Sequence, residues 1–281
     1  MYTAHFGLKE NPFSLSPDPR YLFLSPQHRE ALNCLIYGIN EKKGFMVITG
    51  EIGTGKTTVC RTLLSGLDAS VETALIFNSA ITDMELLAMV NEELGVKAGP
   101  GRRTKKRCID ALNKYLLRRF SENKNVVLLI DEAQNLSHST MEQIRMLSNL
   151  ETVQEKLLQI ILIGQSELRE MLKSPSLKQL NERITVRYHI RALTEKSLGD
   201  YIRHRLTVAG GEGRIEFTWG ALKLIYHYSQ GNPRRINAIC DRALLIAYAK
   251  TRFKVDAWIV RASVKDIGAS YFAGRKLGWR N

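Results

Sequence analysis

Nine residues with the sequence GEIGTGKTT, at positions 50–58, carry the clearest chemical signal in this chain. Gly50, Gly55, Lys56 and Thr57 occupy the fixed places of the phosphate-binding pattern G-x-x-x-x-G-K-[ST]. Glycines let the backbone turn its N–H groups toward a phosphate, and the N-terminus of a following helix adds partial positive charge. The lysine can reach the outer phosphates of a nucleotide, and the threonine hydroxyl can hold Mg²⁺.

The neighbouring sequence fits a phosphate-binding loop. Residues 45–49 form an apolar run typical of a buried strand, and residues 57–67 have the spacing of a helix with one apolar face. Strand, glycine loop and helix together predict a nucleotide site. We expect the phosphates to be surrounded by the whole loop, namely Gly50, Glu51, Ile52, Gly53, Thr54, Gly55, Lys56, Thr57 and Thr58.

Two acidic residues follow a second apolar run about 75 residues later. Residues 126–130 (VVLLI) predict a buried strand, and Asp131 and Glu132 come directly after it. The carboxyl end of such a strand delivers its side chains to the ligand crevice of a parallel sheet. We expect Asp131 to hold Mg²⁺, together with Thr57, and Glu132 to polarise an attacking water.

A third apolar run, residues 157–163 (LLQIILI), ends in Gly164 and Gln165. A polar side chain at the tip of this strand would lie near the outermost phosphate, where Gln165 could orient water. The alternative is an ordinary amide at a strand end.

Strands and helices alternate up to about residue 190, which predicts a parallel, doubly wound α/β core. Residues 184–190 alternate apolar and polar and complete the predicted sheet. After residue 193 the pattern is helical throughout. We therefore expect a core at 1–192 that includes an aromatic N-terminal segment, a small all-helical domain at 193–267 and a basic tail at 268–281.

Composition limits the class of protein. The 281 residues are 44% hydrophobic and 25% charged, as in a soluble globular protein, and no apolar run approaches the length of a membrane helix. The four scattered cysteines suggest neither a zinc site nor a disulfide framework. The N-terminus does not have the build of a signal peptide, so we expect a cytoplasmic protein.

The net charge of +13 favours contact with a polyanion, either nucleic acid or an anionic membrane face. The densest basic cluster comprises Arg102, Arg103, Lys105, Lys106 and Arg107, in a predicted loop. The alternative interpretation is a solvated basic surface.

Several stretches together resemble the AAA+ ATPases of the general secretion pathway protein A (ExeA-like) family. The resemblance runs from about residue 6 to about residue 267, and it extends to the ATPase of MSHA-type pilus biogenesis and, more distantly, to transposition regulators of the TniB/TnsC kind. The stretches that carry it are NPFSLSPDPRYLFLSPQHREAL, GFMVITGEIGTGKTT, LLIDEAQNL, MLSNLE, LLQIILIGQSEL, RYHI and GNPRRIN.

This resemblance implies further roles. Gln165 stands where the first sensor residue does, and Arg234 in the GNPR stretch matches the second sensor, a lid arginine that reaches the γ-phosphate. Arg183 lies where many AAA+ proteins place the arginine finger that completes a neighbour's site, and Arg187 is a close competitor. A planar cation stabilises the charge that develops during phosphoryl transfer. Either arginine could instead be a salt-bridging surface residue.

The family implies an ATP-hydrolysing motor or switch, working as a homo-oligomer, that helps assemble a secretion or type IV pilus-like machine with a partner at the inner membrane. We expect recruitment to the cytoplasmic face of that membrane. The alternatives are a DNA-binding regulator of the transposition kind and a scaffold with negligible turnover. Two departures stand out. Secretion members carry a membrane span and a cell-wall-binding region that this sequence does not show, and Ser166 replaces a proline common in the family.

Overall fold

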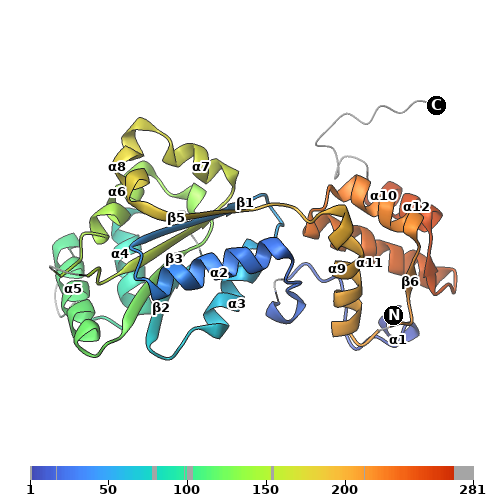
Figure 1. Ribbon diagram of the computed structural model, residues 1–281, viewed down its shortest axis with the longest axis horizontal. Helices are drawn as coiled ribbons and strands as arrows, with labels where there is room; N and C mark the ends of the chain where they lie inside the picture. Colours follow the sequence, from blue (N-terminus) through green and yellow to red (C-terminus); the bar gives the residue numbers. More distant parts are fainter. Residues whose placement is uncertain are drawn as a thin grey trace. The chain divides into compact units, whose positions relative to one another are not determined.

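The computed structural model describes residues 2–16, 18–77, 81–97, 99, 104–152, 155–211 and 213–268. Contacts divide these residues into two compact units, which are considered in turn (Figure 1). A sheet unit takes residues 27–51 and 59–190, and a helical unit takes residues 1–26, 52–58 and 191–281. The phosphate-binding loop, residues 52–58, is therefore grouped with the helical unit.

The sheet unit is built on five parallel strands in the order β2-β3-β4-β1-β5. Its strands are β1 (Phe45–Gly50), β2 (Val71–Ile76), β3 (Asn125–Ile130), β4 (Gln159–Gly164) and β5 (Ile184–Ile190). Its helices are α2 (Pro26–Asn40), α3 (Lys56–Gly66), α4 (Asp83–Glu93), α5 (Lys105–Ser121), α6 (His138–Leu147), α7 (Ser166–Leu172) and α8 (Lys178–Arg183).

Both faces of the central strands are buried, as continuous apolar runs require. One face packs against α4 to α8 in a single apolar core. On the other face, Gly38 of α2 lies so close to β1 that a Cβ there would meet the Met46 sulfur at 2.3 Å. Figure 1 shows α2 and α3 on the side of the sheet away from α6 to α8. The predicted parallel, doubly wound core is confirmed.

The helical unit has its own apolar core. Its elements are α1 (Tyr2–His5), α9 (Glu195–Val208), β6 (Glu216–Phe217), α10 (Trp219–Ser229), α11 (Pro233–Ala249), β7 (Lys254–Val255) and α12 (Ala257–Ile267). The two short strands pair in parallel, so the region we expected to be entirely helical holds one small strand pair.

The aromatic N-terminal segment differs from our expectation, because it packs with the helical unit. Phe6, Phe13 and Tyr21 are buried in that unit's core. The buried guanidinium of Arg205 on α9 lies 4.6 Å from the centre of the Tyr21 ring and donates to the carbonyls of Pro12 and Ser14. A buried cation needs such acceptors, and here the N-terminal backbone supplies them.

Two predicted helix starts need correction. Residues 139–142 (STME) have the pattern of a capping box, but the N-cap of α6 is Ser137, whose hydroxyl accepts from the Thr140 N–H. Helix α5 begins at Lys105, after the N-cap Thr104, so Lys105 and Lys106 belong to a helix that we expected to be a loop. Residues 82–85 (TDME) have the same pattern, and there the capping box forms, with both reciprocal hydrogen bonds between Thr82 and Glu85.

Candidate functional site

The phosphate-binding loop has the backbone that its glycines allow. Gly53 and Gly55 have φ of +80° and +97°, a region that residues with a side chain rarely adopt. Helix α3 begins at Lys56, which is buried along with Thr54. The loop therefore leads straight into a helix N-terminus, the arrangement that binds phosphate.

The GNPR turn contacts this loop directly within the helical unit. Asn232 is the N-cap of α11, and its side-chain oxygen accepts from the N–H groups of Arg234 and Arg235. Its amide nitrogen donates to the Ile52 carbonyl at 2.6 Å, and the Arg234 N–H donates to the Gly53 carbonyl at 3.3 Å. One asparagine thus joins the start of α11 to the loop.

This contact is close enough to require glycine on the loop side. A Cβ at Gly53 would lie 2.5 Å from the Arg234 Cβ and 2.8 Å from the Asn232 side-chain oxygen. Gly231 is equally constrained, because a Cβ there would lie 2.0 Å from the Leu193 carbonyl oxygen. The predicted second-sensor residue, Arg234, is therefore attached through its backbone to the predicted phosphate loop.

In the sheet unit, the acidic pair follows β3 as predicted. Asp131 is buried, and its N–H continues the sheet by donating to the Ile76 carbonyl at 2.9 Å. Glu132 has φ 52° and ψ 35°, a left-handed conformation that is uncommon for a residue with a side chain. The Glu132 N–H donates to the Asp131 carboxylate at 2.9 Å, which stabilises this turn.

Two glutamines hold the Glu132 carboxylate. The Gln165 side-chain amide donates to Glu132 Oε2 at 3.0 Å, and the Gln134 amide donates to the same oxygen at 2.5 Å. The Gln134 side-chain oxygen in turn accepts the backbone N–H of Gln165 at 3.0 Å. Gly164 leaves room for this arrangement, because a Cβ there would lie 2.8 Å from the Gln134 oxygen. The structure thus joins the tips of β3 and β4 around one carboxylate.

Glu51, at the end of β1, joins the same edge of the sheet unit. Its carboxylate accepts the Ser166 hydroxyl at 2.8 Å. Ser166 stands where the resemblance led us to expect a proline, and a proline could not make this bond. The departure therefore adds a link between the β1 and β4 ends.

Arg183 and Arg187 lie away from this edge. Arg183 ends α8 immediately before β5 begins, so it lies at the amino edge of the parallel sheet. Its Nη1 donates at 2.6 Å both to the Ser148 hydroxyl and to the Asn149 side-chain oxygen, which ties it to the end of α6. Arg187 on β5 is exposed, and its guanidinium donates to the Asn181 carbonyl.

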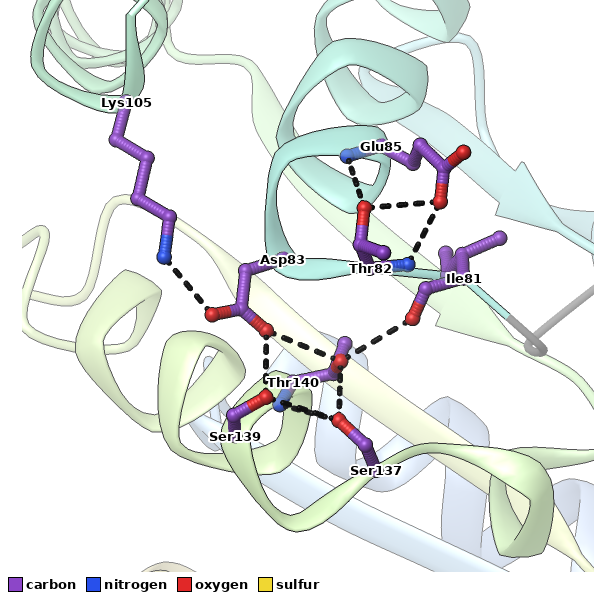
Figure 2. A network of polar contacts seen from close by, with 8 residues as sticks. All are labelled: Ile81, Thr82, Asp83, Glu85, Lys105, Ser137, Ser139 and Thr140. Atoms are coloured by element: carbon purple, nitrogen blue, oxygen red, sulfur yellow. Dashed lines mark hydrogen bonds and ion pairs between the residues drawn. The ribbon is translucent and has the colours of Figure 1, made fainter.

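A polar network at Asp83 positions the helix that follows the acidic pair (Figure 2). One Asp83 oxygen accepts the hydroxyls of Ser139 and Thr140 of α6, both at 3.1 Å. The other accepts the Lys105 ammonium of α5 at 2.8 Å. The single proton of the Thr140 hydroxyl is shared between this carboxylate and the Ile81 carbonyl. The network joins the first turns of α4, α5 and α6.

The basic cluster is only partly described. Arg102 and Arg103 lie outside the described residues, and Lys105, Lys106 and Arg107 form the first turn of α5. Positive charge at a helix N-terminus is unfavourable, and the Asp83 carboxylate compensates it at Lys105.

Comparison with known proteins agrees with these features. Residues 39–172 match a family model described as AAA domain. The chain is 46% identical over 255 residues to general secretion pathway protein A of Aeromonas hydrophila, which covers 91% of this chain and 46% of that protein. This chain is an AAA+ protein of the general secretion pathway protein A type. It spans about half the length of that relative.

Solved structures confirm the AAA+ fold. The Cdc6p structure from Pyrobaculum aerophilum matches with a TM-score of 0.71 at 18% identity, over 94% of this chain and 74% of that one. The ORC2 protein of Aeropyrum pernix, in ADPNP-ADP complexes, matches with 0.63 at 17%, over 96% and 73%. The RuvB branch migration motor of Thermotoga maritima matches with 0.53 at 16%, over 86% and 69%. At these identities the likeness concerns the fold alone.

Two features are absent from the described residues. None of their helices combines the length and the apolar character needed to span a membrane. Nor do they contain a group of three or more His, Cys, Asp or Glu side chains able to hold a metal ion.

Sequence reasoning did not identify Gln134 or the amide of Asn232 as contacts of the site. Gln134 stands two residues after Glu132, but no spacing rule connects a glutamine there to a strand 30 residues later. An asparagine directly before a proline is typical of a helix N-cap, which is the first role of Asn232 in the structure. The second bond of that asparagine depends on tertiary contact with the loop.

The two functions of Asn232 can be separated by substitution. Asn232→Asp keeps an N-cap oxygen but loses the amide donor to the Ile52 carbonyl, whereas Asn232→Ala loses both. We expect the aspartate variant to keep its helix yet bind a fluorescent ADP analogue about tenfold more weakly, since a hydrogen bond is replaced by repulsion. Thr218→Asp, a cap change on α10, is the matched control. Unchanged affinity in Asn232→Asp would show that the bond does not shape the loop.

Asp83 predicts a pH dependence of stability. The Lys105 ammonium, helped by the hydroxyls of Ser139 and Thr140, lowers the pKa of this carboxyl, while partial burial opposes the shift. Because the folded-state pKa lies below the unfolded value of about 4, the stabilisation is complete above that value and is lost as pH falls through the folded-state pKa. Urea unfolding should show Asp83→Asn to be less stable by about 1 kcal/mol at neutral pH, and the difference should vanish in acid. Asp110→Asn, on the exposed side of α5, serves as control, and a pH-independent difference would contradict the assignment.

Proposed function

We propose that this chain binds and hydrolyses ATP. The observation that carries the proposal is the Glu132 carboxylate, held by the Gln134 and Gln165 amides at the carboxyl edge of the sheet. Strand β1, which leads into the phosphate-binding loop, ends on the same edge beside β4. A fixed carboxylate close to the loop's strand is what activation of a water molecule requires.

Each residue has a defined part in the proposed reaction. Lys56 and the N–H groups of the loop bind the phosphates, and Glu132 accepts a proton from the attacking water. Gln165 fixes the Glu132 carboxylate, and Arg234 stabilises charge on the outermost phosphate. The Asn232 side-chain amide and the Arg234 backbone N–H donate to the carbonyls of Ile52 and Gly53, so the lid holds this part of the phosphate-binding loop.

The expected cofactor is Mg²⁺, with ligands from Thr57 and Asp131. Mg²⁺ is usually held by one or two protein oxygens together with phosphate oxygens and water, and it neutralises phosphate charge. One hydroxyl and one carboxylate suit that pattern. The described residues offer no larger cluster of metal-binding side chains.

The cellular role we propose is to drive or switch the assembly of a secretion or type IV pilus-like machine. The support is the 46% identity to general secretion pathway protein A. The proposed setting is the cytoplasm, with recruitment to the inner membrane by a partner protein. We propose an ATPase core that ends at about residue 192, a lid at 193–267 that includes the packed N-terminal segment, and a basic tail at 268–281.

We further propose that hydrolysis depends on a homo-oligomer. Arg183 and Arg187 lie at β5, an edge strand, and Arg183 precedes that strand at the amino edge of the sheet. Neither position is on the edge that carries Glu132, so an arginine there would serve a neighbouring subunit. Arg183 is partly engaged by Ser148 and Asn149, and its remaining nitrogens would make that contact.

Subunit mixing tests an arginine acting in trans. Arg183→Ala should keep ATP binding and lose turnover, and Lys56→Ala should lose its own site. Mixing the two should restore part of the ATPase rate, because the Lys56→Ala subunit supplies Arg183 to its neighbour. Arg187→Ala, mixed in the same way, identifies which arginine acts. If neither arginine variant regains ATPase activity when it is mixed with Lys56→Ala, the proposal that one subunit supplies an arginine to its neighbour's site is contradicted.

A DNA-binding regulator of the transposition kind is the second candidate, favoured by the net charge of +13. The described part of the basic cluster weakens this alternative slightly, because Lys105 is paired with Asp83. Arg102 and Arg103, outside the described residues, would have to supply more of the contact.

ATPase rate against protein concentration, with and without double-stranded DNA at two salt concentrations, separates the two functions. The proposed assembly ATPase should show a rate that rises with concentration and ignores DNA. Strong stimulation by DNA that fades with salt would instead indicate the regulator, since phosphate contacts are salt-sensitive. Lys56→Ala controls for contaminating activity, and a wild-type rate no higher than that of this variant would contradict hydrolysis altogether.

A further inference from the structure

Two tryptophans are exposed at the start of two helices in the helical unit. Trp219 begins α10 and is 71% exposed, and Trp258 lies in the first turn of α12 and is 52% exposed. Large aromatic side chains normally bury most of their area, so exposed indoles indicate a surface used for contact.

The two helices begin side by side. Strands β6 and β7 pair in parallel and lead directly into α10 and α12, and the Thr218 N–H donates to the Val255 carbonyl at 3.0 Å. A Cβ on Gly220 would lie 3.7 Å from the Ala257 Cβ, so these two positions face each other between the helices. Figure 1 shows α10 and α12 as neighbours in this unit.

This geometry places both indoles on one side of the helix pair. Trp219 precedes Gly220 and Trp258 follows Ala257, and successive residues of an α-helix turn by about 100°. The two helices run side by side in the same direction, with Gly220 and Ala257 facing each other. One residue back from Gly220 on one helix and one residue forward from Ala257 on the other therefore point to the same side of the pair. The core lies on the other side, where Ala221 and Ile259 are buried.

Cations surround the two indoles. The Lys223 ammonium lies 3.7 Å from the centre of the Trp219 ring, and the Lys250 ammonium lies 4.7 Å from the Trp258 ring. Arg261 and Lys265 continue the exposed stripe of Trp258 along α12. Among the described residues, these four cations form no ion pair with a carboxylate. We call Trp219, Lys223, Lys250, Trp258, Arg261 and Lys265 the tryptophan face.

The charge of the chain is concentrated in the same region. The described residues between 191 and 268 contain 14 Lys and Arg against six Asp and Glu, a surplus of eight against the whole chain's thirteen. The carboxylates nearest the two helix starts are already paired, Glu216 with Lys254 at 3.1 Å and Asp256 with Arg252 at 3.2 Å. The surface therefore offers positive charge to a negatively charged partner.

We propose that the tryptophan face binds the surface of an anionic lipid bilayer. Indoles favour the boundary between headgroups and acyl chains, because the ring is apolar and its N–H needs a polar partner. Lysine and arginine beside them attract anionic headgroups. A lysine lies over one face of each indole, so only the other face of each ring is open to a stacking base.

This contact goes beyond the proposed ATPase and does not depend on it. It would hold the chain at a membrane directly through its helical unit, without a helix that crosses the bilayer. Loss of lipid binding would leave ATP hydrolysis untouched, and an inactive Lys56→Ala variant should still bind lipid. The two proposals can therefore fail separately.

Co-sedimentation of the full chain with vesicles tests the proposal. We expect binding to vesicles containing phosphatidylglycerol and little binding to pure phosphatidylcholine. Trp219→Ala with Trp258→Ala should weaken binding at least roughly tenfold, because buried aromatic area is lost. Tyr37→Ala is the matched control, since Tyr37 is 55% exposed on the sheet unit and also carries a lysine, Lys43, over its ring. Arg261→Glu with Lys265→Glu should abolish the preference for anionic lipid.

Fluorescence gives a readout that does not depend on sedimentation. In a Trp279→Phe background the remaining tryptophans are Trp219 and Trp258, and their emission should shift to the blue with anionic vesicles. Equal binding by the double alanine variant, or no shift, would overturn the proposal. So would a tryptophan-dependent complex with a single-stranded oligonucleotide in place of lipid, or tryptophan-dependent self-association, because the face would then serve another partner.

Discussion

The left-handed backbone of Glu132 is the constraint on which the candidate site depends. A residue with a side chain in this conformation costs of order 1 kcal/mol or more, and it persists only where its surroundings fix it. Here the Asp131 carboxylate accepts the Glu132 N–H, and the Gln134 and Gln165 amides both bond the Glu132 carboxylate. These hydrogen bonds fix both the backbone turn and the carboxylate of Glu132, directly after the end of β3.

The surrounding fold serves this arrangement at two levels. Sheet order places β4 between β3 and β1, so the β4 tip can bond toward both neighbours, through Gln165 to Glu132 and through Ser166 to Glu51. Beyond the sheet, the Asp83 network holds the first turn of α6, which follows the acidic pair. In the helical unit, Asn232 and Arg234 hold the phosphate-binding loop through the carbonyls of Ile52 and Gly53.

Motif and periodicity were enough to predict the architecture. Strands buried on both faces appear in the sequence as continuous apolar runs. The glycine loop needs positive φ angles, which its glycines adopt easily. Residue types alone were therefore enough to predict these strands and the loop between strand and helix. The contacts of Gln134 with Gln165, of Ser166 with Glu51 and of the Asn232 amide with Ile52 were missed because each joins residues that are distant in sequence. The N-terminal segment was assigned to the core because it precedes the core in the sequence. It packs instead with the helical unit, where its backbone carbonyls and the Tyr21 ring contact the buried Arg205.

The most direct test of this account is the fate of ATP on a Glu132→Gln variant, which keeps the shape and loses the carboxylate. After incubation with Mg²⁺ and ATP, gel filtration and analysis of the bound nucleotide should recover uncleaved ATP, with turnover at least about a hundredfold below wild type, as loss of a general base predicts. Glu142→Gln, an acidic change on α6, should hydrolyse normally. Wild-type turnover by the Glu132→Gln variant would contradict the central claim that this carboxylate activates water.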